Sequence, residues 1–293
     1  MKNNNKIIIF ALAGGLSVLT ATASVMVDFT LSLDTATNPS ANYNNFHEAE
    51  GGTHDVFTVG FQVQIHSIDG TTVNVPAVAA FCSELEESVS TIRYDNTFEA
   101  TSLSYLAGGQ AGVEGTASSA IPVGGIGQQR AAYVNYFFDA YYISDVLSGW
   151  AYTEDDPKSH AFQLALWEIT HDEGLSLATG EISIGLQDDG GTDVTTRNNG
   201  ILRAQEMLDD VYLNLASISD TYISTNFSIW ALANVGVSGE AGLQDVVLAI
   251  AKDSPTDAVL EPFLPAPAIP EPATHALMGL FGMVYWVGRR CHS

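Results

Sequence analysis

The chain has 293 residues, of which 46% are hydrophobic and 15% are charged, so it can bury one substantial core or two small ones, and disorder throughout is excluded. Between Ser24 and Ile269, 33 acidic residues stand against 6 basic ones and give this part of the chain a net charge of −27. Binding to a nucleic-acid backbone depends on Lys and Arg displacing counterions, so we expect no nucleic-acid partner. Cations, amines and neutral glycans remain possible partners.

The N-terminus has the three parts of a secretory signal peptide. Lys2 and Lys6 precede an apolar run over residues 7–19, and Ala21 and Ala23 follow it with the small-x-small spacing that a signal peptidase cleaves. A buried core helix is the alternative, but the position, the basic start and the short apolar length favour export. We therefore expect the mature chain to begin after Ala23 and to fold outside the cytoplasm.

The C-terminus has a second three-part pattern. Pro270, Glu271 and Pro272 precede an apolar stretch of sixteen residues and then the pair Arg289 and Arg290. At a rise of about 1.5 Å per residue this stretch spans roughly 24 Å as a helix, a little short of a bilayer core, and the arginine pair favours a cytoplasmic end.

This order of tripeptide, apolar span and basic pair, in Ile-Pro-Glu-Pro-Ala-Thr-His-Ala-Leu and then Arg-Arg, resembles the PEP-CTERM sorting signal of Gram-negative bacteria that make exopolysaccharide. The resemblance implies that an exosortase cuts near the Pro-Glu-Pro motif, so that the membrane helix is a temporary tether. A plain tail anchor is the alternative.

These signals divide the chain into four expected parts. Six of the ten prolines lie from Pro255 to Pro272, which predicts an extended, semi-rigid spacer before the sorting signal. The parts are a signal peptide (1–23), an exported domain (24–253), a Pro-rich spacer (254–269) and a sorting signal with a transmembrane helix (270–293).

Period-two hydrophobicity predicts strands at both ends of the exported domain. Alternating apolar residues from Phe57 to Ile65 predict one strand, Asp69-Gly70 predicts a hairpin turn, and Val73 to Phe81 runs back toward Cys82. Further strands are expected over 222–232 and 246–250.

Helical spacing lies between these strands. Apolar residues recur at helical intervals over 134–141 and 201–215, the second stretch with a possible cap at Thr196, and Asp156-Pro157 starts a third helix. Because the strands cluster at the two ends, we expect an α+β fold, a single β-sandwich or barrel-like domain with helical insertions, rather than a parallel βαβ fold.

Cysteine usage directs attention to Cys82. The second cysteine, Cys291, follows the arginine pair and lies on the other side of the membrane or on a removed fragment, so the two do not pair. An exported domain with one cysteine is unusual, because an unpaired thiol there is either buried and inert or chemically committed.

The third helix carries polar residues beside its apolar stripe. Phe162, Ala165, Leu166 and Ile169 form the stripe, and on a different face His160, Gln163 and Trp167 are stacked neighbours.

Phe81-Cys82 followed by acidic residues, and Phe162-Gln163-Leu164-Ala165-Leu166-Trp167-Glu168-Ile169 eighty residues on, resemble the two halves of the thioester domains of bacterial surface proteins. In that family a cysteine and a distant glutamine close an internal thioester, so the resemblance implies a bond between Cys82 and Gln163. The sequence departs from the family at Phe162, where many members have threonine in a Thr-Gln-x-Ala motif. It also lacks Leu or Val plus Asp directly after the cysteine.

The thioester forms when the Cys82 thiolate attacks the Gln163 amide and expels ammonia, which requires close contact because amides are poor electrophiles. An amine or hydroxyl then opens it, joins residue 163 covalently and regenerates the thiol. Trp167 is a candidate shield from water and His160 a candidate base. Each residue also has a plain structural interpretation: a buried thiol, a solvent-facing glutamine, a core tryptophan and a solvated histidine.

Other motifs are weaker. The stretch Asp188 to Asp193 offers oxygen ligands around glycines but lacks EF-hand spacing, so a solvated turn is favoured and no metal site is expected. There is no Gly-x-Ser-x-Gly, no His-Glu-x-x-His and no phosphate loop, and no cofactor is expected.

The leading hypothesis is a cell-surface or matrix protein, not an enzyme, that couples covalently to amines or hydroxyls in exopolysaccharide or on a neighbouring surface. The alternative is a noncovalent structural or glycan-binding β-domain with a buried thiol, and an unrecognised hydrolase is third.

We predict that the native host secretes a form that begins near Ser24 and ends near Pro270, because both ends carry cleavage signals. Intact-mass analysis of the secreted protein tests this. Recovery only of a species that retains residues 273–293 would rule out the sorting signal.

Overall fold

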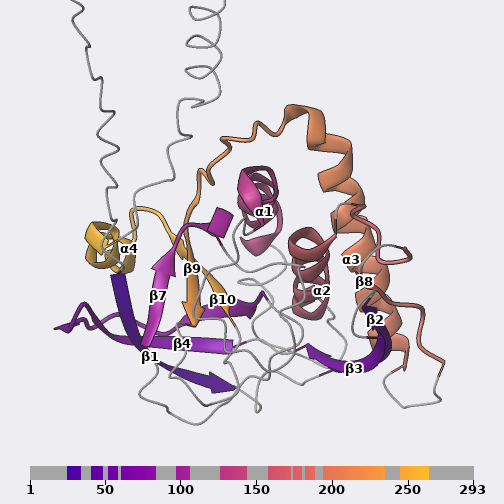
Figure 1. Ribbon diagram of the computed structural model, residues 1–293, viewed down its shortest axis with the longest axis horizontal. Coiled ribbons are helices and arrows are strands. Elements are labelled where there is room, and N and C mark those ends of the chain that lie inside the picture. The colour runs from indigo at the N-terminus through magenta and orange to yellow at the C-terminus, as the bar shows by residue number, and fades with distance from the viewer. Residues whose placement is uncertain are drawn as a thin grey trace, which may run out of the picture.

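The computed structural model describes residues 25–33, 41–48, 52–58, 61–83, 97–105, 126–143, 158–172, 174–179, 182–188, 194–234 and 245–263. They form a mixed α+β domain, in which antiparallel strands make a six-stranded barrel and helices lie against one side of it (Figure 1). The prediction of a barrel-like domain with helical insertions is confirmed. The signal peptide and the sorting signal lie outside the described residues. Within the described ranges, no helix is both long and apolar enough to cross a membrane.

The barrel closes because its first and last strands pair with each other. Its order is β1 (Val25–Leu33), β7 (Thr97–Thr101), β9 (Phe227–Asn234), β10 (Val246–Ala251), β6 (Val78–Cys82) and β4 (Phe61–Ile68), with β4 pairing back onto β1. Val63 and Ile65 of β4 are buried while Gln62 and Gln64 are only partly so, which assigns the apolar face of the strand to the barrel interior.

The hairpin predicted at Asp69-Gly70 is confirmed. Both residues have positive φ, 49° and 72°, the combination of a type I′ turn, and they join β4 to the short β5 (Thr71–Thr72). The returning strand expected from Val73 begins only at Val78, as β6, which pairs antiparallel with β4 and ends at Cys82 as expected.

The single strand predicted from Phe57 to Ile65 is wrong. β3 (Gly52–Thr58) ends before Phe61 and belongs to a second sheet of order β3-β2-β8, with β2 (Ala41–Glu48) and β8 (Ile182–Ser183). Hydrophobic alternation runs through both strands without a break, and only the pairing partners separate them.

The three predicted helices are present. They are α1 (Gly127–Tyr141), α2 (Lys158–His171) and α3 (Val194–Asn214), with short 3-10 turns at Leu103–Tyr105 and Leu215–Ser217. Because α3 begins at Val194, the predicted cap Thr196 is wrong and lies inside the first turn. Asp156-Pro157 falls outside the described residues. The strand expected from Tyr222 begins only at Phe227, as β9.

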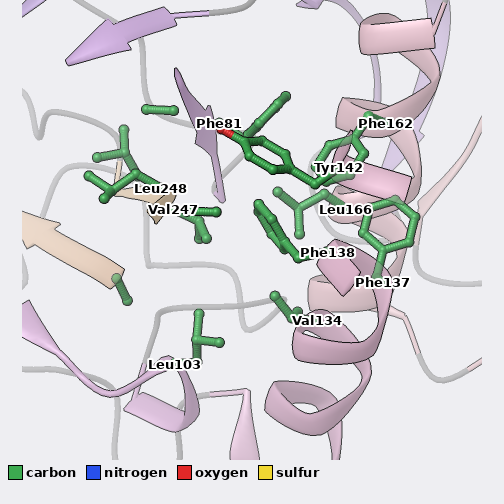
Figure 2. Close-up of a cluster of buried hydrophobic side chains, with 14 of the residues drawn as sticks. Phe81, Leu103, Val134, Phe137, Phe138, Tyr142, Phe162, Leu166, Val247 and Leu248 are labelled. Carbon is green, nitrogen blue, oxygen red and sulfur yellow. The ribbon is translucent and has the colours of Figure 1, made fainter. Parts of the chain in front are cut away.

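Helix α2 is the central helix of the domain. Every residue from His160 to Asp172 is buried. Phe162 packs against Phe81 of β6 with ring centroids 4.6 Å apart and against Phe137 of α1 at 4.4 Å (Figure 2). This aromatic contact fixes α2 between the barrel wall and α1.

The extended spacer predicted over 254–269 is wrong for its first part. Ser254 caps α4 (Pro255–Leu260) by accepting a hydrogen bond from the Asp257 amide at 3.0 Å, and a 3-10 turn, Glu261–Phe263, follows. Leu260 is fully buried in the core. A capping serine followed by proline at the first helical position favours a helix here, which composition alone did not reveal.

Asp139 of α1 holds the segment that leads into β9. Its carboxylate accepts hydrogen bonds from the Tyr222 hydroxyl at 2.8 Å, the Ser224 hydroxyl at 2.5 Å and the backbone amides of Thr225 at 2.7 Å and Asn226 at 3.1 Å. Partial burial would raise the pKa of Asp139, but these hydrogen bonds outweigh it and lower the pKa below the ordinary 3.8.

We predict that Asp139→Asn lowers the free energy of unfolding by about 1–3 kcal/mol at neutral pH, because an amide cannot accept all these hydrogen bonds. The native carboxylate's contribution is present above pH 3.8 and is lost as the pH falls below that value, so the gap between wild type and variant narrows in acid. Urea unfolding of wild type and variant at pH 7 and pH 3 measures the difference in unfolding free energy and its dependence on pH. A difference that is the same at both pH values contradicts a lowered pKa of Asp139.

Candidate functional site

The site forms where the end of β6 meets α2. Cys82 is opposite Val246 of β10, and the next amide, that of Ser83, donates to the Asp245 carbonyl at 3.0 Å. Because successive strand residues direct their N–H and C=O groups to opposite sides, those of Cys82 point away from β10, toward the β4 side.

Gln163 of α2 meets the Cys82 backbone with both ends of its carboxamide. The Cys82 amide donates to Gln163 Oε1 at 3.1 Å, and Gln163 Nε2 donates to the Cys82 carbonyl at 2.7 Å. We call this contact the amide pair. Cys82 is 3% exposed and Gln163 2% exposed, so the pair is shielded from water.

Gln163 takes the place of a neighbouring strand. In the described register, β4 begins at Phe61, which is opposite Ala80, two residues before Cys82. The carboxamide therefore supplies Cys82 with the donor and acceptor that a β4 longer by two residues would have supplied in this register.

The Cys82 side chain lies on the interior face of the barrel. Residues paired across strands share a face, and Cys82 is opposite Val246, which in turn is opposite Leu232 of β9. The thiol is attached to the Cα between the two backbone groups that bind Gln163, so rotation about one side-chain bond is the motion that changes its approach to the carboxamide.

The amide pair also polarises the carboxamide. The Cys82 N–H donates to Oε1, the oxygen that would carry negative charge if a nucleophile added to the carbonyl carbon. A donor fixed at that oxygen in a buried site lowers the cost of the charge.

His160 and Trp167 flank Gln163, about one turn of α2 to either side, and both are buried. The solvated histidine and solvent-facing glutamine considered as alternatives are therefore wrong, because no face of α2 reaches the surface. The roles of His160 as base and Trp167 as shield stay predictions.

The sequence did not single out Glu168 and His171, two buried titratable residues of α2. Glu168 accepts a hydrogen bond from the Ser176 amide at 2.6 Å, and burial, with a smaller effect of Asp172, raises its pKa to about 8. Burial lowers the pKa of His171 to about 4, and its ring lies 3.0 Å from the Trp167 carbonyl. A charged residue inside an otherwise apolar helix was the one available signal.

The described part of the chain contains no group of three His, Cys, Asp or Glu residues that could hold a metal ion. Of the acidic stretch considered as a calcium loop, only Asp188 is described, and it is exposed. Residues 189–193 lie outside the described ranges, so the expectation of a solvated turn is untested.

No protein-family model and no curated protein matches the chain. Among solved structures, the chain is similar to the N-terminal thioester domain of fibronectin-binding protein SfbI from Streptococcus pyogenes, at 12% identity and a TM-score of 0.35, over 74% of this chain and 95% of that one. It is also similar to the N-terminal domain of the Streptococcus pyogenes pilus tip adhesin Cpa, at 12% identity and a TM-score of 0.37, over 75% and 97%. At these values neither likeness assigns a role to any residue here.

We predict that Glu168→Gln stabilises the domain at alkaline pH. The folded state keeps the Glu168 proton up to about pH 8, whereas the unfolded state releases it near 4.5, so wild-type stability falls as the pH rises between these values. Glutamine keeps an acceptor for Ser176 and has no proton to lose.

In urea unfolding from pH 4.5 to 8.5, the free energy of unfolding of the variant should rise relative to that of wild type as the pH rises. The relative increase should reach at least about 1 kcal/mol at the top of the range. Glu206→Gln, at an exposed position, is the matched control and should change stability little at any pH. A Glu168→Gln curve parallel to wild type contradicts the assignment.

Proposed function

We propose that this chain is an exported cell-surface or matrix protein whose domain forms an internal thioester between Cys82 and Gln163 and uses it to couple covalently to amines or hydroxyls. The amide pair is the observation that carries the proposal, because it holds a buried cysteine and a buried glutamine in contact although 81 residues separate them. Attack on a poor electrophile requires the two residues to be held close together, and in this proposal the Cys82 sulfur then turns toward the Gln163 carbonyl carbon.

The bond-forming step is balanced within the protein. The Cys82 sulfur adds to the Gln163 carbonyl carbon, the carbon–nitrogen bond breaks, and the thiol proton leaves with the nitrogen as ammonia. An incoming amine or hydroxyl later adds to the same carbon, the carbon–sulfur bond breaks, and the sulfur takes the proton that the nucleophile gives up.

Two features favour this chemistry at this place. The Cys82 N–H is aimed at the oxygen on which charge develops, and burial excludes water that would hydrolyse the thioester. We assign His160 as the base for the incoming group and Trp167 as the shield. Each molecule would react once, so the domain is not an enzyme and needs no cofactor.

The proposed partners follow from the termini and the charge. An exosortase-type enzyme would process the C-terminal signal after a membrane-tethered intermediate, and exopolysaccharide or a neighbouring surface would supply the amines or hydroxyls. The charge of −27 between Ser24 and Ile269 argues against nucleic acid.

The mass of the purified protein tests the proposal. We expect the fresh protein to weigh one ammonia less than its sequence, and methylamine to add one amine and expose one thiol. Cys82→Ala and Gln163→Ala should each abolish both signals, whereas Gln128→Ala, at an exposed position of α1, should keep both. His160→Ala should slow aminolysis by about 10- to 1,000-fold without preventing bond formation.

A protein of full sequence mass that does not react with methylamine would overturn the proposal. The noncovalent β-domain with a buried thiol would then be the remaining function.

A further inference from the structure

The amide pair has a chemical requirement that an unmodified carboxamide meets and that a carboxylate, an ester or a trans secondary amide does not. The N–H and C=O of Cys82 point to the same side of β6, so residue 163 must present an acceptor and a donor side by side. In a carboxamide this donor is the Nε2 hydrogen on the same side as Oε1.

We propose that the amide pair is a one-way latch between β6 and α2, which is closed before the thioester forms and open after any nucleophile except ammonia has reacted. The proposal rests on the proposed function, since it concerns the products of thioester opening. In the thioester itself the covalent bond takes the place of the pair.

Each product of thioester opening can be compared with that requirement. Water leaves a carboxyl group at position 163, which in its ionised form only accepts and faces the Cys82 carbonyl with a second acceptor. A hydroxyl leaves an ester, which has no N–H. A primary amine leaves a secondary amide that keeps one N–H, but in the preferred trans form the substituent, not the hydrogen, lies on the side of the oxygen.

Turning that secondary amide to the cis form would restore the pair at a cost of about 2.5–4 kcal/mol, more than a hydrogen bond contributes. Ammonia alone regenerates the original carboxamide and closes the latch.

An open latch loosens one end of the junction without unfolding it. The Cys82 N–H and C=O lose their partner in a place that is almost fully buried, which destabilises that end of β6. The neighbouring contact of Phe162 with Phe81 does not depend on residue 163 and still holds α2 on the barrel (Figure 2). Covalent coupling would therefore destabilise the end of β6 and its pairing with Val246 of β10.

Ammonia and methylamine give a matched test on the same purified protein. Each opens the thioester and exposes one thiol, which mass analysis verifies, and the two products differ by one methyl group on nitrogen. We expect the methylamine product to exchange the Cys82 amide hydrogen at least about 10-fold faster than the ammonia product and to melt at least about 4 °C lower. Equal exchange and melting of the two products would overturn the proposal.

A second series separates the latch from the thioester. Cys82→Ala keeps the backbone groups of position 82 but cannot form the bond, and Cys82→Ala with Gln163→Glu reproduces the hydrolysed product. We expect the double variant to melt at least about 4 °C below the single one and to exchange the position-82 amide faster. If wild type has its full sequence mass, the proposed function fails. Equal melting and exchange of the two variants would overturn the latch alone.

Discussion

Helix α2 is buried from His160 to Asp172, so the polar side chains of this stretch have only groups inside the protein as partners. Gln163 binds the Cys82 backbone, Thr170 donates to the Leu166 carbonyl at 3.0 Å, and Glu168 accepts from Ser176. An unpaired polar group in such a place would cost about 1–3 kcal/mol, so these contacts are a condition of the fold. The candidate site is one of them.

The same constraint accounts for the contact between Cys82 and Gln163 at the candidate site. The amide pair gives both backbone groups of Cys82 a partner and engages both ends of the Gln163 carboxamide, which a purely structural contact would also do. The amide pair differs from an ordinary structural contact because the residue that donates its N–H to the carboxamide oxygen is a cysteine and also carries a thiol. Under the proposed function, the buried glutamine that pairs with the end of β6 would also be the electrophile for the Cys82 thiol.

Glu168 ties α2 to the second half of the domain. Its partner Ser176 begins a segment in which the Leu177 amide donates to Gln205 of α3 at 3.0 Å and the Leu177 carbonyl accepts from Ile184, just after β8, at 2.8 Å. One buried helix therefore connects the barrel, α3 and the small β3-β2-β8 sheet through hydrogen bonds.

The sequence by itself determined the α+β class, the hairpin at Asp69-Gly70, the helices and the end of a strand at Cys82, because hydrophobic period and turn chemistry are local properties. It did not separate β3 from β4 or place Leu260 in the core, since pairing partners and packing come from distant parts of the chain. Sequence also named Cys82 and Gln163, but only the tertiary structure brought them together, because a separation of 81 positions along the chain carries no information about distance in space. The all-round burial of α2 decided the rest: it turned a glutamine that helical spacing could leave in solvent into the missing strand partner of Cys82.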